Sequence, residues 1–525
     1  MSTVRERAFE VLRAHGVTTM FGNPGSTEIP LLADFPRDFR YVLGLQEAGV
    51  TAMAIGYALA SDGAAAVNIH TFVGTGNAMG MIATAWHAQA PLVITAGEQD
   101  RRMLRSEPFL SGKHVEFARP YVKWSVEVTR SVDVPEVLER AYHLAMSEPR
   151  GPVFVSIPMD GLQDSCPPVV PREVSSRTAP DPSALARAAA VLDRGKRFAI
   201  VVGSQADAAS ATTDLVALAE RLRAAVFLAP EIYRIGFPTN HPLYQGMLPP
   251  AAKPLADRLR PYDTVLVVGA PVFAYYPYVP GPPVHAGTQL VQLTNDPSMA
   301  SRALVGSSVV GDVALAVRGL LDLVRVSPRH APLRRSPKAG RASRRLDPDT
   351  VFGTLAKALP KNAILAAEAP SWQRHLLEHV RLRDPGSFYA SASGSLGFAL
   401  PAAVGIALAQ PDRPVVSILG DGSAQYTIQG LWTAARYRVP VTFIVLDNEE
   451  YAILKSFERF QRLRGVPGLD LPGVDFEGIA RGYGLSFSRV TGADDLGPIL
   501  EAAFAGGVPS VVHVPIDPFI PKLLR

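Results

Sequence analysis

The residues Val415-Val416-Ser417-Ile418-Leu419-Gly420-Asp421-Gly422-Ser423 have the pattern of a buried strand that ends in an aspartate flanked by glycines. A second apolar run, residues 441–446, follows a helix-like stretch and ends in Asp447-Asn448. The residues between Gly422 and Asp447 suffice for one helix and the next strand. This order predicts a parallel sheet. Asp421 and Asn448 are then both expected at the carboxyl ends of strands, where such sheets bind ligands.

The groups at these two strand ends suit a hard divalent cation that also contacts a phosphate. Mg²⁺ prefers oxygen ligands in an octahedron and often shares phosphate oxygens. Asp421 offers a carboxylate, Asn448 an amide oxygen and Glu450 a backbone carbonyl. The flanking glycines allow close approach of the backbone, and Ser423 can open a helix whose N–H groups face a diphosphate. Two ordinary strand–turn–helix corners would use the same residue types, but the spacing and the asparagine favour a cation and diphosphate site.

Short apolar strands and helical segments alternate along the chain and divide it into three α/β blocks. The predicted strands are 19–21, 41–43, 66–69, 92–95 and 153–158 in the first block, 198–203 and 264–269 in the second, and 364–366, 415–419, 441–446 and 510–514 in the third. A Pro-rich stretch, residues 166–182, separates the first two blocks. We therefore predict an α/β fold of three domains, residues 1–170, 182–326 and 345–525, each a mainly parallel sheet flanked by helices.

The composition excludes several classes of function. A net charge of +4 on 525 residues gives no case for nucleic-acid binding. Cys166 is the single cysteine, which excludes an internal disulfide and a cysteine-based metal site. The N-terminus lacks the apolar core of a signal peptide, and the longest apolar run, residues 397–409, is too short to span a bilayer. We therefore expect a cytoplasmic protein with no membrane partner. One basic cluster, interleaved with Pro and Ser, is interpreted as a solvated linker and comprises Arg334, Arg335, Lys338, Arg341, Arg344 and Arg345.

Several stretches match one known family across nearly the whole chain. They are Phe21-Gly22-Asn23-Pro24-Gly25-Ser26, Gly74-Thr75-Gly76-Asn77-Ala78, Leu396-Gly397-Phe398-Ala399-Leu400-Pro401-Ala402-Ala403, Gly420-Asp421-Gly422-Ser423-Ala424 and Leu431-Trp432-Thr433-Ala434-Ala435. They resemble the thiamine-diphosphate-dependent 2-oxo acid decarboxylases, and most closely the benzoylformate decarboxylases. The resemblance implies a pyrimidine-binding, a middle and a diphosphate-binding domain, with thiamine diphosphate and Mg²⁺ (or Ca²⁺) as cofactors. It also implies a homotetramer whose active sites are each shared between two subunits.

The resemblance assigns roles around the cofactor. Glu47 matches the glutamate that places a carboxyl beside the pyrimidine N1′ and so promotes loss of the thiazolium C2 proton. By itself, Glu47 is an ordinary acid in the first turn of a helix. Gly394 would accept a hydrogen bond from the cofactor's amino group, and Leu396, which alone would be interpreted as core, would be the apolar wedge beneath the cofactor. The implied cofactor contacts are Glu47, Ser371, Gly394, Leu396, Gly422, Ser423, Asn448 and Tyr451, and the implied metal ligands are Asp421, Asn448 and Glu450.

Two further residues are expected to handle the substrate. Ser26 follows the turn Asn23-Pro24-Gly25, and its hydroxyl can bind a substrate carboxylate. Thr27 and Glu28 make a helix N-cap an equally credible role for that serine. His70 ends a predicted strand and can transfer protons near neutral pH, although a lone histidine at a strand end is usually structural. The resemblance implies catalytic roles for both Ser26 and His70.

The chain departs from the family pattern in the middle block. A second active-site histidine is expected after the strand at 264–269, but Tyr276 stands there, and the nearby His285 does not align. Slower proton delivery would allow an aldehyde to intercept the reaction, which is carboligation. Ala390 stands where the family has an aromatic residue, which predicts a larger pocket, and Pro370 and Gln373 replace threonines. The implied pocket comprises Ser26, Phe109, Leu110, Tyr276, Ala390, Leu454 and Phe457.

The sequence predicts an enzyme, a carboxy-lyase that uses thiamine diphosphate and Mg²⁺ to decarboxylate an aromatic or bulky 2-oxo acid such as benzoylformate, giving an aldehyde and CO₂. A carboligase or lyase that uses the same cofactor on aldehydes or 2-oxo acids remains the alternative. A non-catalytic binding protein is disfavoured, because it would not need Glu47, Ser26 and His70 together. A flavin or nicotinamide enzyme is disfavoured as well, because no Gly-x-Gly-x-x-Gly follows a predicted strand with a suitably placed acid.

Overall fold

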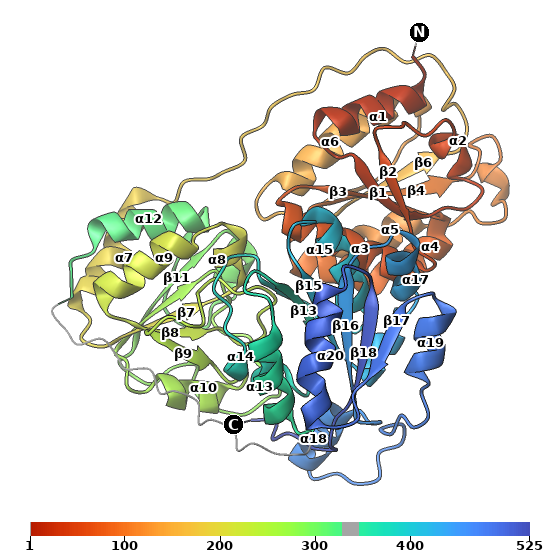
Figure 1. Ribbon diagram of the computed structural model, residues 1–525. Coiled ribbons are helices and arrows are strands. Elements are labelled where there is room, and N and C mark those ends of the chain that lie inside the picture. The colour runs from red at the N-terminus through yellow and green to blue at the C-terminus, as the bar shows by residue number, and fades with distance from the viewer. Residues whose placement is uncertain (1, 328–345, 525) are drawn as a thin grey trace.

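The computed structural model describes residues 2–327 and 346–524. The predicted basic linker residues 334–345 and the outer limits 1, 345 and 525 of the predicted domains lie outside the described residues. The described chain contains three six-stranded sheets, in which all strand pairs are parallel and helices cover the faces (Figure 1). This confirms the predicted α/β fold of three domains.

The first sheet has the strand order β2-β1-β3-β4-β6-β5. Its strands are β1 Thr19–Asn23, β2 Arg40–Leu43, β3 Ala65–Ile69, β4 Leu92–Glu98, β5 Ser125–Glu127 and β6 Val153–Pro158. The helices are α1 Val4–Ala14, α2 Ile29–Leu32, α3 Glu47–Ser61, α4 Thr71–His87, α5 His114–Ala118 and α6 Val134–Met146. Helices α1 and α6 cover one face of the sheet, and α3 and α4 cover the other (Figure 1).

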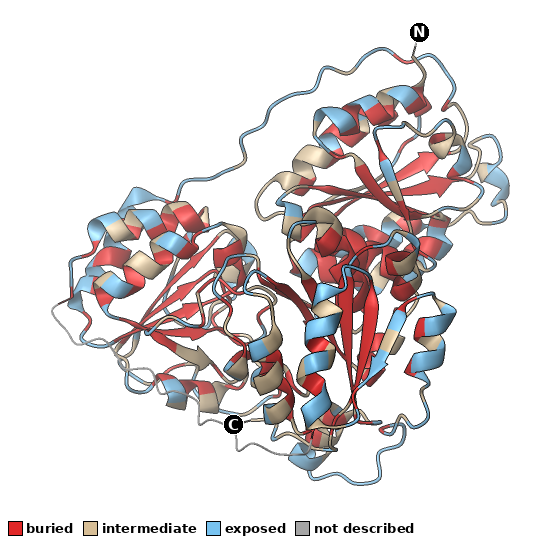
Figure 2. Ribbon diagram, viewed as in Figure 1, coloured by how far each residue is buried: buried red, intermediate tan, exposed pale blue. Residues whose placement is uncertain are grey.

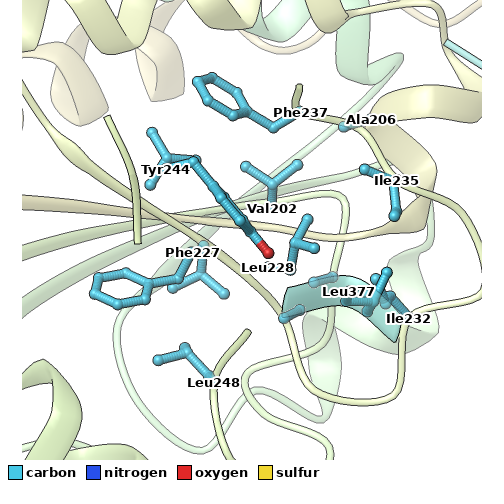
Figure 3. Close-up of a cluster of buried hydrophobic side chains, with 14 of the residues drawn as sticks. Val202, Ala206, Phe227, Leu228, Ile232, Ile235, Phe237, Tyr244, Leu248 and Leu377 are labelled. Atoms are coloured by element: carbon cyan, nitrogen blue, oxygen red, sulfur yellow. The ribbon is translucent and has the colours of Figure 1, made fainter. Parts of the chain in front are cut away.

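The middle sheet has the order β12-β11-β10-β7-β8-β9. Its strands are β7 Phe198–Val202, β8 Ala225–Leu228, β9 Tyr244–Met247, β10 Thr264–Val268, β11 Gln289–Thr294 and β12 Ser307–Val310, and its helices are α7 Pro182–Arg194, α8 Ser204–Ala208, α9 Thr212–Leu222, α10 Ala252–Leu259, α11 Pro297–Ser301 and α12 Val313–Leu323. Its core contains Phe227 and Tyr244, and Leu377 of the third domain packs into the same cluster (Figure 3). The middle and third domains therefore share buried apolar surface.

The third sheet has the order β14-β13-β15-β16-β18-β17. Its strands are β13 Ile364–Glu368, β14 Phe388–Ala390, β15 Val415–Gly420, β16 Val441–Asp447, β17 Ser486–Arg489 and β18 Ser510–Pro515. Its helices are α13 Pro348–Ala358, α14 Gln373–His379, α15 Ala399–Ala409, α16 Asp421–Gln425, α17 Gly430–Arg436, α18 Ala452–Gln461, α19 Phe476–Gly482 and α20 Ala493–Ala505. The strands of the third sheet therefore have the same order along the sheet as the strands of the first sheet, with β13 to β18 in the places of β1 to β6.

Helices α3 and α15 join the first domain to the third. Both are apolar around nearly their whole circumference and buried, as expected of a helix packed on all sides. The backbones approach closely, because a Cβ on Gly56 would lie 2.3 Å from the Ala402 carbonyl oxygen and one on Gly405 would lie 1.9 Å from that of Met53. The long apolar run at 397–409 is thus an interdomain contact. Among the described residues, no helix combines the length and apolarity needed to cross a membrane.

The predicted Pro-rich connection is seen as a long segment between the first and middle domains (Figure 1). Residues 167–179 have no helix or strand, and most of them are exposed (Figure 2). Buried residues are concentrated in the three sheets and in the helix faces turned toward them (Figure 2).

Candidate active site

The third domain brings Asp421 and Asn448 to one edge of its sheet. Strands β15 and β16 pair in register up to Gly420 and Leu446, so the residues that follow them are neighbours. Asp421 is buried and begins α16; its Oδ1 accepts a hydrogen bond from the Gly422 N–H at 2.7 Å. Its Oδ2 has no hydrogen-bond partner in the described part of the chain. Burial raises the pKa of Asp421, and the neighbouring Asp447 carboxylate adds to that rise.

This environment fits a bound cation. A buried carboxylate with one free oxygen and an unfavourable charged form is stabilised when a cation comes within reach. Asp447 is already occupied, because its Oδ2 lies 2.7 Å from Nε2 of His513. Asn448 donates from Nδ2 to Oε1 of Glu450 at 3.4 Å, so the amide oxygen is the end left for a cation. The donor atoms at this edge are oxygens, the kind that Mg²⁺ and Ca²⁺ prefer.

One detail at this edge differs from the sequence prediction, and another adds to it. Helix α16 begins at Asp421 with Gly420 as its N-cap, so Ser423 lies inside the first turn rather than opening the helix. A Cβ on Gly422 would lie 2.4 Å from Cε1 of Tyr451, so that glycine leaves room for the tyrosine ring. The absence of a side chain at Gly422 therefore permits packing against Tyr451, in addition to any close approach of a diphosphate.

A cavity of about 1120 Å³ lies between the middle and third domains. Several predicted site residues line it, namely Ser371, Gly394, Leu396, Tyr276, Ala390 and Leu454, together with Pro370 and Gln373. Phe457 packs against Tyr276 with ring centroids 4.9 Å apart. His375 and His379, which the sequence reasoning did not single out, also line the cavity, whereas His285 does not. The Nε2 of His379 lies 3.0 Å from Oδ1 of Asp349.

Glu368 holds the loop that carries Gly394 and Leu396. It is the last residue of β13, and its carboxylate accepts hydrogen bonds from the N–H groups of Gly397, Phe398 and Ala399 at 2.6, 2.7 and 2.8 Å. Burial raises the pKa of Glu368 to about 7, although the three N–H donors work against that shift. The sequence reasoning missed this residue. Its position at a strand end, like that of Asp421, was the available signal.

The first domain fixes Glu47 at the start of α3. The carboxylate is buried, and each of its oxygens accepts one hydrogen bond: Oε1 from Nδ2 of Asn23 and Oε2 from Nδ2 of Asn77, both at 3.0 Å. A Cβ on Gly74 would approach Cγ of Glu47 to 3.3 Å, so α4 packs tightly against it. Asn23 and Asn77 lie in stretches that carried the family resemblance, yet neither was assigned a role.

Glu28 joins His70 to the turn that carries Ser26. Its Oε2 lies 2.8 Å from Nδ1 of His70 and also accepts from the Gly25 N–H at 2.8 Å. Nδ1 of His70 is therefore the ring nitrogen that Glu28 holds, and Nε2 is the other one. Helix α2 begins at Ile29 with Glu28 at its N-cap, so Ser26 is not a helix cap and lies exposed on the turn.

The predicted site residues form two separate groups within one chain. Ser26, Glu47 and His70 belong to the first domain and do not line the cavity described above. Phe109 and Leu110 do not line it either, and Phe109 is 88% exposed. The single chain thus holds one group of candidate site residues on the first domain and, apart from it, a cavity between the other two domains.

Comparison with known proteins supplies independent information. Three family models match in order: the N-terminal TPP binding domain of thiamine pyrophosphate enzymes over residues 2–116, the central domain over 185–320 and the C-terminal TPP binding domain over 371–514. The chain is 44% identical to benzoylformate decarboxylase of Pseudomonas aeruginosa, over 99% of this chain and 100% of that protein. The crystal structure of benzoylformate decarboxylase from Polynucleobacter necessarius is 41% identical, covers 99% of this chain and 100% of that chain and has a TM-score of 0.97. The 4-hydroxybenzoylformate decarboxylase of Rhodococcus jostii RHA1 is 40% identical over the same shares, with a TM-score of 0.96.

Proposed function

Because the chain belongs to the thiamine pyrophosphate enzyme family and is a carboxy-lyase homologous to the benzoylformate decarboxylases, we propose that it decarboxylates an aromatic or bulky 2-oxo acid such as benzoylformate. The products are CO₂ and the corresponding aldehyde. The observation that carries this proposal is Glu47, buried and held at both carboxylate oxygens by Asn23 and Asn77. A protein that only bound the cofactor would have no need of a carboxyl positioned in this way.

Thiamine diphosphate, when bound, supplies the nucleophilic carbon and the electron sink that decarboxylation requires. Glu47 would hold a proton at the pyrimidine ring. Asp421, Asn448 and the Glu450 carbonyl would hold Mg²⁺ or Ca²⁺. Ser371, Gly394, Leu396, Gly422, Ser423 and Tyr451 would complete the cofactor contacts.

The remaining predicted residues would handle the substrate. The Ser26 hydroxyl would bind the carboxylate of the 2-oxo acid. His70 would move a proton through Nε2, because Glu28 holds Nδ1. The aryl or alkyl group would occupy the cavity beside Tyr276, Ala390 and Leu454. Phe457 would support the Tyr276 ring.

We propose that one active site is completed by two chains. The first-domain group of one copy would face the cavity of another, and Phe109 and Leu110 would reach the pocket in the same way. The separation of the two groups within one chain and the 88% exposure of Phe109 support this arrangement. A homotetramer, as the family resemblance implies, would contain two such pairs. We also propose the domain limits 1–170, 182–326 and 345–525, which the sequence pattern and the family resemblance support.

Carboligation is the second candidate, and Tyr276 is the observation that favours it. This residue lines the cavity where the family pattern has a histidine, and a phenol is a weaker proton donor than an imidazolium near neutral pH. If proton delivery is slow, an acceptor aldehyde can compete for the bound carbon unit. The product would then be a 2-hydroxy ketone.

The test measures aldehyde and CO₂ release from benzoylformate and from a panel of bulky 2-oxo acids, with and without thiamine diphosphate and Mg²⁺. Cofactor-dependent aldehyde release supports the decarboxylase. Cofactor binding without aldehyde from any acid, together with 2-hydroxy ketone formation from added aldehydes, supports carboligation instead. Tyr276→His should shift the product ratio toward the free aldehyde. Tyr278→His is the matched control, because Tyr278 is exposed and does not line the cavity.

A further inference from the structure

Three metal-ligating side chains meet on the first domain, away from the groups described above. His15 caps the C-terminus of α1, and Glu139 and His143 lie one helical turn apart on α6. Helices α1 and α6 pack together on the face of the sheet opposite to α3 and α4 (Figure 1). The side chains of His15, Glu139 and His143 are 9%, 5% and 13% exposed, so the three polar groups meet in a sheltered place.

The ligand atoms of these side chains converge on one point. Nε2 of His15 lies 2.6 Å from Oε2 of Glu139, and Nε2 of His143 lies 3.0 Å from Oε1 of Glu139. One ligand atom from each residue lies within 4.8 Å of the other two. Residues at i and i+4 share one face of a helix, so Glu139 and His143 approach the point together while His15 approaches from α1.

Surrounding contacts fix the orientation of all three groups. The His15 ring stacks on Tyr142 with centroids 3.9 Å apart and planes 16° apart, and the His143 ring meets His15 edge-on. The Arg172 N–H, on the connection to the middle domain, donates to Oε1 of Glu139 at 2.9 Å. Such supporting contacts are typical of metal ligands, whose orientation they hold.

We propose that His15, Glu139 and His143 bind one Zn²⁺ ion. Two imidazole nitrogens and one carboxylate oxygen form a three-residue zinc ligand set, with water as the fourth ligand. Metal–ligand distances of about 2.0–2.2 Å need only small movements of side chains that already point at one another. Mg²⁺ and Ca²⁺ are excluded by the ligand type, because these cations prefer oxygen. The site is therefore distinct from the oxygen-rich edge around Asp421 and Asn448.

A bound ion would tie helices α1 and α6 together and hold the carboxylate that the connecting segment contacts. His15 ends the first helix, Glu139 and His143 belong to α6, and Arg172 contacts the same carboxylate from the connecting segment. Metal binding stabilises whichever state forms the complete ligand set. The expected consequence is a more stable first domain and an anchored start of the connection to the middle domain. Without an ion, the same groups form a hydrogen-bonded trio, which is the alternative that the experiment must separate.

The experiment uses the full-length protein, freed of metals with a chelator and then saturated with thiamine diphosphate and Mg²⁺ to fill the cofactor's cation site. Equilibrium dialysis against Zn²⁺ should show one tightly bound zinc per chain. Co²⁺ should give the intense visible absorption of a four-coordinate ion with nitrogen ligands. His143→Gln and His15→Gln should each weaken zinc binding by at least about tenfold. His241→Gln is the matched control, because His241 pairs with Glu220 at 3.3 Å and, among residues 2–327 and 346–524, this pair belongs to no group of three such ligands.

Each outcome decides the proposal. One zinc per wild-type and His241→Gln chain, lost in His143→Gln, supports it. Absence of zinc from the Mg²⁺-saturated wild-type protein overturns it, and that result does not depend on whether any variant folds. Equal zinc affinity in wild type and in a folded His143→Gln protein also overturns it, because the ion would then lie elsewhere.

Discussion

The first and third domains have the same strand order, yet they present different chemistry at equivalent positions. The order β2-β1-β3-β4-β6-β5 becomes β14-β13-β15-β16-β18-β17 when each strand is replaced by its counterpart. His70 follows β3, whereas Asp421 follows the equivalent strand β15. Glu47 follows β2, whereas the loop that carries Gly394 follows β14. The shared topology places candidate site residues at strand ends, and the side chain at each end determines which proposed role the domain can take, proton transfer for the first domain and cation binding for the third.

Packing between the two domains follows the same equivalence. Helix α3 comes after β2 and helix α15 after β14, and these two counterparts pack against each other. Gly56 on one helix and Gly405 on the other permit the close contact. The equivalent helices of the two similar domains thus pack against each other, while the side chains at the strand ends differ.

The largest expected effect comes from removing the acid of the first domain. Glu47→Gln keeps the shape of the side chain but cannot hold or release the proton that the proposed cofactor activation requires. We expect kcat to fall about a hundred- to ten-thousandfold, the range for lost acid–base catalysis. Affinity for thiamine diphosphate should change little, since the cation site is untouched. Steady-state decarboxylation and cofactor titration measure the two quantities, and a fully active variant would contradict the role of Glu47.

A second prediction concerns a buried histidine beside the first sheet. Nε2 of His114 lies 2.7 Å from Oγ of Ser156 on β6, and the side chain is 1% exposed. Burial lowers the pKa of His114 to about 4. The unfolded chain, with an ordinary pKa of about 6.5, takes up the proton first as the pH falls. Stability from this group is therefore complete above pH 6.5 and is lost between about pH 6.5 and 4, by up to about 3 kcal/mol.

Denaturation midpoints of wild type and His114→Asn, measured from pH 7.5 to 4.5, test this prediction. The difference between the two proteins should shrink as the pH falls, because only the wild type loses the contribution. Burial also raises the pKa of Glu98, whose Oε2 lies 3.5 Å from Nδ1 of His114, and this carboxyl is present in both proteins. A difference that stays constant with pH would contradict the assignment. The equivalent strand of the third domain, β18, carries His513 with a carboxylate partner, so the two histidines differ in environment.

The third prediction concerns Asp421 in the third domain. Asp421→Asn removes the charge that the cation would neutralise, and a lost interaction with a charged group amounts to about 1.5–3 kcal/mol. We expect the concentration of thiamine diphosphate needed for half-maximal activity at fixed Mg²⁺ to rise about tenfold to a hundredfold. Activity at saturating cofactor should fall less than in Glu47→Gln. Cofactor titrations at several Mg²⁺ concentrations provide the measurement. An unchanged cofactor requirement would remove Asp421 from the cation site.

The smallest expected effect tests the contact between α3 and α15. Gly56→Ala places a Cβ against the Ala402 carbonyl and should destabilise the protein by about 1–3 kcal/mol. Gly49→Ala is the matched control in the same helix, because nothing lies within 4 Å of its Cβ position. That change should be neutral or stabilising by about 0.4–1 kcal/mol. Thermal unfolding curves compare the two variants, and equal effects would show that the close approach of the helices is unimportant for stability.

Much of the fold could be predicted from the sequence, but most strands of the middle sheet, including the interior strands β8 and β11, and the short or exposed edge strands β5, β14 and β17 were not predicted. Buried apolar runs such as 415–419 and 441–446 stand out, because every residue in them is apolar or small. Strands β5 and β14 have three residues each, and β17 is mostly exposed, so none has a distinctive pattern. Edge strands of this kind form because a neighbouring strand offers free backbone groups, and that neighbour is remote in sequence.

The supporting residues of the candidate site escaped prediction for the same reason. Glu47 and Asp421 were singled out from local patterns and a resemblance. Glu28 and Glu368 were missed, although Glu28 reaches His70 across 42 positions of sequence and Glu368 reaches Phe398 across 30. A hydrogen bond between such residues leaves no periodic signal in the chain.

The sequence by itself determined where strands end in glycine, aspartate and asparagine, and hence which residues reach the carboxyl edges of the sheets. These features depend on neighbours within a few positions, so a local pattern suffices. Only the tertiary structure decided that α3 packs on α15, that Ser26 and His70 lie apart from the cavity of their own chain, and that His15 meets Glu139 across 124 positions. Such contacts depend on how separate elements pack, because hydrogen bonds and close packing act over a few ångströms regardless of distance along the chain.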